Sequence, residues 1–249
     1  MKFGSSVLLL CLFCPTARAE WLYNSLTQPA LARFEPSLKN ALRLEVGVPI
    51  DEQGSAGVTS SVAVQHRLAK WLALSAELGW IMGADSETRS ILGLDLKVGW
   101  TKGSHTKHGS GGNFALLGDL RFELGTDSAV IEPVLILAAA LGPFGAELYA
   151  GPNFAFPVRD IDTRGIATGF LYGAMLNTSV YLCHLGLGFR GFESFGGDQT
   201  HYALEVGLRA HIKSPEIFPF VRATIPLSND SINLATAVVF GVNWLYSAQ

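Results

Sequence analysis

Apolar residues recur at every second position along most of this chain, from about residue 40 to its end. In the first such segment, 42–50, leucine, valine and isoleucine alternate with Arg43, Glu45, glycine and proline. A period of two is typical of a β-strand with one apolar face, whereas an amphipathic helix repeats every 3.6 residues. The pattern predicts an all-β fold of about twelve strands, or ten if the less regular middle of the chain is divided differently. The twelve predicted segments are 42–50, 58–68, 72–80, 92–100, 116–124, 130–141, 144–156, 166–177, 179–191, 202–212, 218–227 and 232–246.

The length of these segments favours a barrel that crosses a membrane. Strands of soluble proteins mostly have roughly 5–6 residues, whereas a tilted strand needs roughly 9–11 residues to span a bilayer. Aromatic residues also gather at the segment ends, as in the interfacial girdles of membrane barrels. The predicted girdle residues are Trp71, Trp80, Trp100, Phe144, Phe154, Phe156, Tyr202, Phe218, Trp244 and Tyr246. We therefore predict a transmembrane antiparallel up-and-down β-barrel over residues 40–249, closed so that no unpaired strand edge meets lipid.

Charged side chains fall almost entirely on one face of each predicted strand. A charge that faces hydrocarbon costs about 2–4 kcal/mol at the membrane midplane, so this face should line the lumen. The residues predicted to line the lumen are Arg43, Glu45, Arg67, Glu77, Asp95, Lys97, Asp119, Arg121, Glu123, Glu205, Arg209 and Arg222, with Glu132, Glu147 and Arg190 on the same face. Acidic and basic side chains are nearly balanced. This predicts weak ion selectivity, because strong selectivity needs a ring of one sign.

Part of the predicted lumen face is apolar. The residues concerned are Val134, Ile136, Ala138, Leu171 and Met175. A wholly water-filled pore would not use such side chains. Two explanations stay open: the N-terminal leader packs against them, or this wall passes an amphipathic solute.

The N-terminus has the pattern of a secretory signal peptide. Lys2 is followed by a short apolar run, 7–13, and by the small-residue cleavage site at 17–19. We expect residues 1–19 to be removed and residues 20–39 to form a leader, which either plugs the barrel or is an ordinary flexible segment. Cys183 is then the single remaining cysteine, so an intramolecular disulfide is excluded.

Composition excludes two further classes of protein. Only 16% of the residues are charged and 49% are hydrophobic, whereas a disordered chain is more polar and more charged. The net charge of −3 and the absence of a clustered basic face argue against nucleic acid as a partner.

The C-terminal residues Gly241, Trp244 and Tyr246 stand in the pattern polar-x-Gly-x-x-aromatic-x-aromatic, with Val239 at the polar position. This segment resembles the C-terminal assembly signal of bacterial outer-membrane β-barrel proteins, a porin-like family. The resemblance implies insertion by the barrel-assembly machinery into the outer membrane of a Gram-negative-type bacterium. Outer-membrane lipid would then surround the barrel.

Catalytic and metal-binding patterns are weak. Outer-membrane phospholipases use a Ser/His pair near the lipid, but here His211 and Ser214 lack the His-x-Ser spacing. His105 and His108 share a loop without Cys, Asp or Glu, and a stable metal site needs three or four ligands. We expect no enzyme activity, no metal and no cofactor.

The leading functional prediction is a narrow passive channel for small solutes. A barrel of this size has a bore intermediate in width between the filled interior of an eight-stranded barrel and the wide channel of a large porin. One alternative is a closed structural barrel whose lumen charges form a sealing salt-bridge network. Another is an uptake channel for hydrophobic compounds along the apolar wall, and an outer-membrane lipid hydrolase is the remaining one.

Overall fold

The computed structural model describes twelve stretches of the chain: 40–50, 57–82, 88–103, 112–125, 128–141, 144–158, 168–180, 183–197, 200–210, 212–213, 216–227 and 236–246. The predicted signal peptide (1–19), the predicted leader (20–39), His105 and His108 lie outside the described residues. The strands are β1 (Ala41–Ile50), β2 (Val58–Ala69), β3 (Leu72–Met82), β4 (Thr88–Gly103), β5 (Gly112–Gly125), β6 (Ser128–Leu141), β7 (Phe144–Pro157), β8 (Gly169–Val180), β9 (Cys183–Ser194), β10 (Thr200–Ala210), β11 (Ile212–Lys213), β12 (Glu216–Pro226) and β13 (Thr236–Leu245). No helix long and apolar enough to cross a membrane occurs in the described residues.

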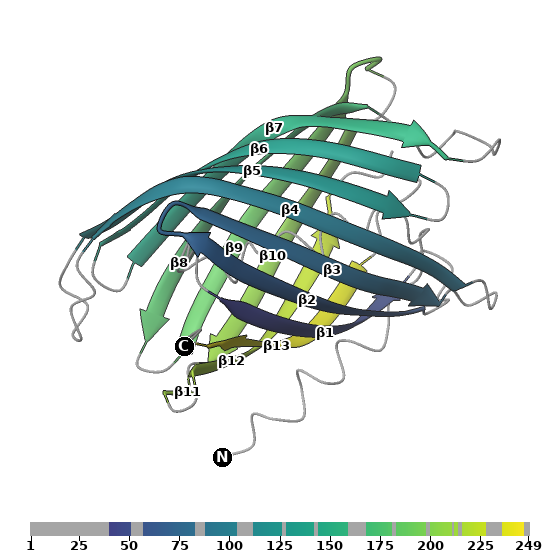
Figure 1. Cartoon of the computed structure of the whole chain (residues 1–249). Coiled ribbons are helices and arrows are strands. Elements are labelled where there is room, and N and C mark those ends of the chain that lie inside the picture. The colour runs from purple at the N-terminus through teal and green to yellow at the C-terminus, as the bar shows by residue number, and fades with distance from the viewer. Residues whose placement is uncertain are drawn as a thin grey trace.

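The sheet closes on itself to form a barrel (Figure 1). Neighbouring strands pair antiparallel in sequence order, and β1 pairs with β13 from Ala41 opposite Leu245 onward. The pairing of β10 with β12, including Arg209 opposite Phe220, completes the ring. The two-residue β11 pairs with β12 and extends the hairpin of β10 and β12, so we do not count it as a separate strand of the wall. The wall therefore has twelve strands in up-and-down order, which confirms the predicted fold class.

The sequence pattern misplaced the boundary between the eighth and ninth strands. It predicted a break at residue 178 between the segments 166–177 and 179–191, but β8 continues to Val180 and β9 starts at Cys183. Asn177 is paired with Gly186 in the ladder, and its side chain is buried on the inner face. This polar residue thus lies in the interior of the barrel and not in a turn.

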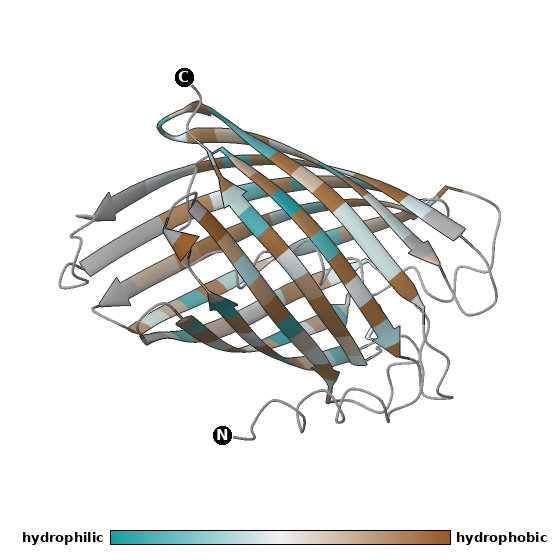
Figure 2. Ribbon diagram, turned by 90° about the horizontal axis from the view of Figure 1, so that it is seen from below, coloured by the Kyte–Doolittle hydropathy of each residue, from teal (hydrophilic) through white to brown (hydrophobic). Residues whose placement is uncertain are grey.

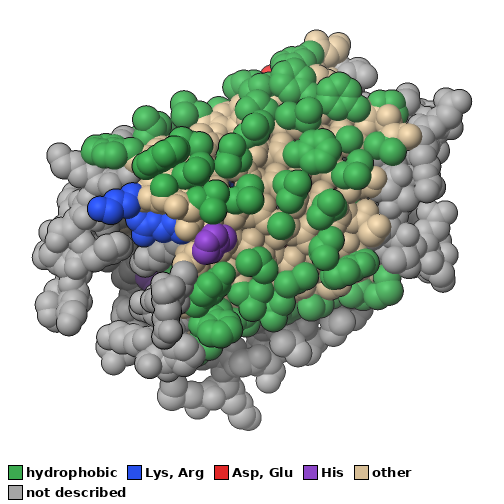
Figure 3. Space-filling view, viewed as in Figure 1, with side chains coloured by type: hydrophobic (Ala, Val, Ile, Leu, Met, Phe, Trp, Pro, Cys, Tyr) green, Lys and Arg blue, Asp and Glu red, His purple; other side chains and the backbone are tan. Residues whose placement is uncertain are grey.

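Side chains alternate along the strands between an apolar outside and a mixed inside. On β4, for example, Leu92, Leu94 and Leu96 are exposed, whereas Gly93 between them is buried. Hydrophobic positions interrupt polar ones at regular intervals along the strands (Figure 2). Hydrophobic side chains cover most of the described surface in Figure 3, and charged ones lie at its margin. An apolar band of this extent suits a lipid surrounding and not water.

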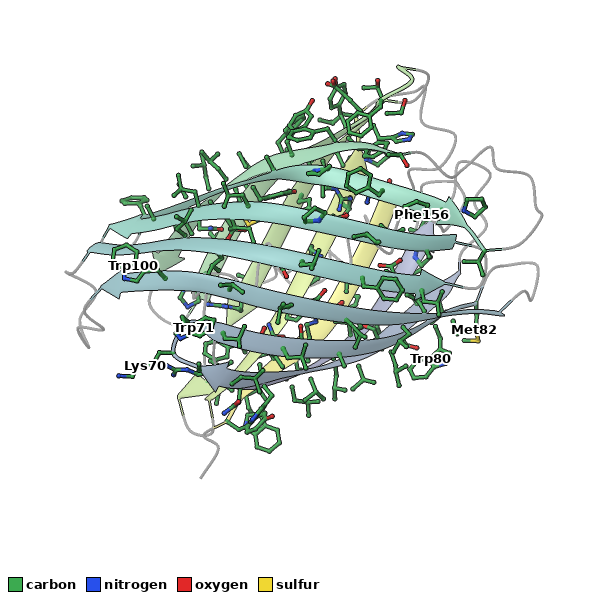
Figure 4. All side chains as sticks on the ribbon, turned by 45° about the horizontal axis from the view of Figure 1, so that its top comes forward. Lys70, Trp71, Trp80, Met82, Trp100 and Phe156 are labelled. Carbon is green, nitrogen blue, oxygen red and sulfur yellow. The ribbon has the colours of Figure 1, made fainter. Side chains whose placement is uncertain are left out.

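Aromatic side chains mark both ends of this band. Figure 4 shows Trp71 and Trp100 at one end of the barrel and Trp80 and Phe156 at the other, and all four are exposed. Such rings prefer the interface between hydrocarbon and headgroups, so they agree with the predicted girdles.

One predicted girdle residue was wrong. Phe218 lies on the inner face of β12 and is only 6% exposed. Its position follows from the alternation on that strand, because Phe218, Phe220 and Arg222 share one face and all three are buried. An aromatic residue near a strand end was read as interfacial although its parity places it inside.

Candidate functional site: the barrel lumen

One row of inward side chains crosses the four neighbouring strands β1 to β4. It allows a contact between side chains of β1 and β3, which are not direct neighbours. The register places Arg43 opposite Ala63, Ala63 opposite Glu77 and Glu77 opposite Gly93. Alanine and glycine leave the space above β2 and β4 open on the lumen side. Arg43 therefore reaches over β2 to Glu77, with 3.2 Å between Nη2 and Oε2. The guanidinium of Arg121 comes toward the same carboxylate, and its Nη2 would be 3.5 Å from a Cβ at Gly93.

These contacts belong to a chain of ion pairs that runs from β12 to β5. Arg222 Nη2 is 4.0 Å from Glu45 Oε2, and Glu45 Oε1 is 3.2 Å from Arg43 Nε. Glu77 Oε2 then connects Arg43 at 3.2 Å to Arg121 Nη2 at 3.9 Å. Both signs alternate along this chain, so each charge has an opposite neighbour.

Arg121 is the branching point at the β5 end. Its Nη2 donates to Glu123 Oε2 at 2.8 Å, and its Nε is 4.0 Å from Asp95 Oδ1. The Ser75 hydroxyl donates to Asp95 Oδ2 at 2.8 Å. We call the inward residues of this network the charged wall: Arg43, Glu45, Ser75, Glu77, Asp95, Arg121, Glu123 and Arg222. Most of these side chains are buried, and buried ions are stable only when they are paired and hydrogen-bonded.

A second surface, which we call the apolar wall, occupies the next part of the ring. It consists of Leu117 on β5, Val134, Ile136 and Ala138 on β6, Tyr149 on β7, Leu171 and Met175 on β8, and Phe192 on β9. Six of these residues form one buried cluster that also includes Ala73 and Ala203. Ile136, Leu171 and Met175 are at most 2% exposed. This packing makes one side of the lumen similar to a protein core.

Polar side chains border the apolar wall. Arg190 Nη1 lies 3.7 Å from Glu205 Oε1, and both side chains are buried. The ring of His201 stacks on Phe192 with 5.9 Å between centroids. Arg209 Cζ lies 4.8 Å from the centre of the Phe218 ring, within the range of a cation–π contact.

The remaining predicted lumen residues are less buried. Lys97 and Asp119 are half-buried, and Lys97 Nζ donates to Gln65 Oε1 at 3.1 Å. Arg67 is exposed at the end of β2, where its Nε donates to the Ala69 carbonyl at 3.1 Å. Arg67 therefore stands at the mouth of the barrel, outside the ion-pair chain.

Two of the three residues of the C-terminal pattern have a clear place in the wall. The Trp244 ring is exposed on the outer face and lies 6.2 Å from the Tyr246 ring. Gly241 is covered by the ring of Phe220 on β12, and a Cβ at this position would collide with that ring and with the Leu44 carbonyl. Glycine is therefore required here by packing, whatever its part in assembly.

Several aromatic residues of the lumen are not among those predicted from the sequence. Tyr149, Phe192, His201, Phe218 and Phe220 are all buried on the inner face. Their alternation with the outward residues of the same strands indicates that they lie on the inner face. His201, for example, has the same parity as Glu205 and Arg209, which were assigned to the lumen.

Within the described residues, no group of three or more His, Cys, Asp or Glu side chains could hold a metal ion. The Cys183 thiol is free and exposed. The chemistry that the described lumen offers is thus ion pairing, hydrogen bonding and apolar contact.

Comparison with known proteins shows the fold of the chain but no family. No protein-family description and no curated protein matches the sequence. The KdgM porin has a TM-score of 0.61 at 12% identity, over 83% of this chain and 99% of the porin. The same porin in complex with disordered oligogalacturonate matches at 13% identity, with a TM-score of 0.61 over 83% of this chain and 99% of that one. The NanC porin has a TM-score of 0.59 at 10% identity, over 82% and 100%.

These likenesses and the apolar outer band define the class of protein. The chain has the fold of an outer-membrane β-barrel of twelve strands, similar to those of the KdgM and NanC porins.

Proposed function

We propose that this protein is a narrow passive channel for small solutes in the outer membrane of a Gram-negative bacterium. The observation that carries the proposal is the two-sided lumen, in which a continuous ion-pair chain faces a cluster of buried apolar side chains. A barrel that served only as an anchor could fill its interior with apolar residues alone. A polar path beside an apolar one suits small solutes that carry both kinds of surface.

The charge balance of the lumen bears on the type of solute. Each arginine of the charged wall has a carboxylate partner, so the wall presents alternating signs and little net field. We propose weak ion selectivity for this reason. The oligogalacturonate seen with the KdgM porin is acidic, and the balanced wall gives no reason to transfer that preference to this chain.

The direct test is electrical conductance of the refolded mature protein in a planar lipid bilayer. We expect discrete steps and a reversal potential near zero in a salt gradient. The absence of steps at any voltage, both with and without residues 20–39, would overturn the channel proposal. Migration on a gel that changes with heating serves as the control for a folded barrel.

The second candidate, a closed structural barrel, is favoured by the burial of the lumen. Arg190, Glu132, Glu147 and Arg222 are each at most 2% exposed. In this case the ion pairs would seal the bore. We propose residues 20–39 as the leader or plug that governs closure, so a version without them discriminates between a gated and a sealed barrel. A barrel that conducts only after this deletion is gated by the leader, whereas one that stays silent is a structural barrel.

We also propose that the C-terminal strand, with Gly241, Trp244 and Tyr246, is recognised by the barrel-assembly machinery. The pattern resembles the assembly signal of this class, and Trp244 is exposed on the outer face. The double variant Trp244→Ala/Tyr246→Ala should lower the amount of folded barrel in cells while the purified chain still refolds in detergent. Equal amounts of folded barrel in cells would contradict the proposal. Neither this proposal nor the channel assigns a catalytic step to the chain.

A further inference from the structure

The ladder between β6 and β7 is interrupted near its middle. Paired positions run from Ser128 opposite Pro157 to Ile131 opposite Phe154, and they resume at Leu135 opposite Ala150. The register is the same on both sides of the gap. We call the stretch without ladder pairs between these two strands, 132–134 on β6 and 151–153 on β7, the seam.

Two prolines explain the seam. Continuing the register places Pro133 opposite Pro152, and neither residue has a backbone N–H to donate to the ladder. On the lumen side the backbone of β6 comes so close that a Cβ at Gly151 would collide with the Pro133 carbonyl. Proline and glycine together therefore replace regular pairing with a local distortion of the wall.

The outer surface is hollowed at the same place. A groove of about 860 Å³ lies over β4 to β8. Leu120, Leu135, Leu148 and Phe170 line it from the lipid-facing side, together with both prolines of the seam. Val134 and Tyr149, which point inward, also line this groove. The floor of the groove is thus the barrel wall at the seam.

Apolar residues lie on both sides of the barrel wall at the seam. Val134 and Tyr149 belong to the buried cluster of the apolar wall, where they meet Ile136 and Leu171. The same two residues therefore belong both to the lining of the outer groove and to the inner cluster. The half-buried Asp119 is the charged residue among the groove's lining residues.

A side-chain hydrogen bond holds the two strands together at one end of the seam. Asn153 Nδ2 donates to Glu132 Oε2 at 2.8 Å, and both side chains are buried. Elsewhere, opening a barrel wall in lipid would leave backbone donors and acceptors without partners, each at a cost of several kcal/mol. At the seam two of these donors are missing already, so separation of the strands breaks fewer backbone hydrogen bonds.

We propose that the seam is a lateral exit through which small apolar molecules pass from the lumen into the hydrocarbon of the outer membrane. This inference rests on the proposed channel, since the molecules must first enter the lumen, and it assigns the apolar wall to such compounds. The charged wall then carries water and polar solutes along the barrel axis. The two routes share the bore but leave it at different places.

The seam can be locked by a disulfide. In a Cys183→Ser background, Leu135→Cys and Ala150→Cys put two thiols at directly facing positions beside the seam. The matched control is Leu116→Cys with Leu137→Cys, a facing outward pair on the uninterrupted ladder between β5 and β6. The full-length chain is expressed in Gram-negative cells, and uptake of the apolar dye N-phenylnaphthylamine is followed by its fluorescence.

We expect oxidation of the 135/150 pair to lower dye uptake to the level of cells without the chain, and reductant to restore it. The oxidised control pair should take up dye at the wild-type rate. Dye uptake by the oxidised 135/150 pair at the wild-type rate would overturn the lateral exit. Planar-bilayer conductance of the same variants is measured in parallel and should persist in both. Absence of conductance in the wild type would refute the proposed channel, whereas wild-type dye uptake by the oxidised 135/150 pair of a conducting barrel would refute the lateral exit alone.

A second variant avoids cysteines altogether. Pro133→Ala with Pro152→Ala restores two backbone donors and should slow dye uptake while the axial conductance stays. Pro219→Ala is the control, because Pro219 lies within a continuous ladder opposite Val242. If the double variant takes up dye at the wild-type rate, the prolines do not create the exit and the proposal fails.

Discussion

The charged wall and the apolar wall line the same bore but are stabilised by different interactions. In the charged wall, Glu77 depends on Arg43 and Arg121, so each side chain needs its partner. In the apolar wall, Ile136 and Leu171 contribute burial and close packing, which tolerate a change of shape if the volume is kept. The two walls therefore fill the lumen in different ways, and they should differ in their response to an exchange that keeps the volume of the side chain.

The largest effect is expected when the branching point of the charged wall is removed. Arg121→Ala leaves Asp95 and Glu123 without their shared cation, and a broken buried pair costs about 3–5 kcal/mol. The free energy of unfolding should fall by that amount in denaturant titrations in detergent, and the remaining carboxylates should shift conductance toward cation selectivity. Arg67→Ala is the matched control at the exposed mouth and should stay within about 0.5 kcal/mol of wild type. Equal stabilities of these two variants would refute the idea of an interdependent network.

The next effect concerns the apolar wall. Leu171→Ala creates a cavity in the buried cluster and should cost about 2–5 kcal/mol. Leu171→Met keeps the volume and should cost less than about 1.5 kcal/mol. The corresponding exchange in the charged wall, Arg121→Lys, should be poorly tolerated because lysine cannot contact several carboxylates as arginine does. Leu176→Ala, on the lipid-facing side of the same strand, is the control. If it destabilises the barrel as much as Leu171→Ala, the two faces of β8 are equivalent and the apolar wall is not a core.

The smallest effect is expected where aromatic and charged groups of the lumen meet. Phe218→Leu removes the ring that lies 4.8 Å from Arg209 Cζ and should cost about 1–2 kcal/mol. A double-mutant cycle with Arg209→Met should return a coupling energy of similar size. A coupling energy of zero would show that the contact adds nothing, and Phe240→Leu on the outer face controls for loss of ring area.

Much of the fold could be predicted because the alternation of apolar and polar residues shows which face of its strand each residue occupies. On β4, exposed leucines alternate with inward Gly93 and Asp95, and this period is visible in the sequence. The pattern failed where residue type was read without its parity. The residue type of Phe218 suggests a girdle, whereas its parity, which it shares with the buried Arg222 of the same strand, places it on the inner face.

The partners of the lumen residues could not be predicted from the sequence. The contact of Arg43 with Glu77 depends on the register of three strands and on the small side chain of Ala63 between them. The seam is invisible for the same reason, since Pro133 and Pro152 matter only because the register makes them face one another. Periodicity describes a single strand, whereas these features belong to pairs of strands.

The central claim is that both walls line one path for solutes. It is tested most directly by single cysteines in a Cys183→Ser background, modified with a membrane-impermeant thiol reagent during conductance recording. Ser75→Cys represents the charged wall and Met175→Cys the apolar wall, and Leu176→Cys on the lipid-facing side of β8 is the control. We predict that the reagent lowers the current through the first two variants and leaves the current through the third unchanged. An unchanged current through Met175→Cys would contradict this prediction.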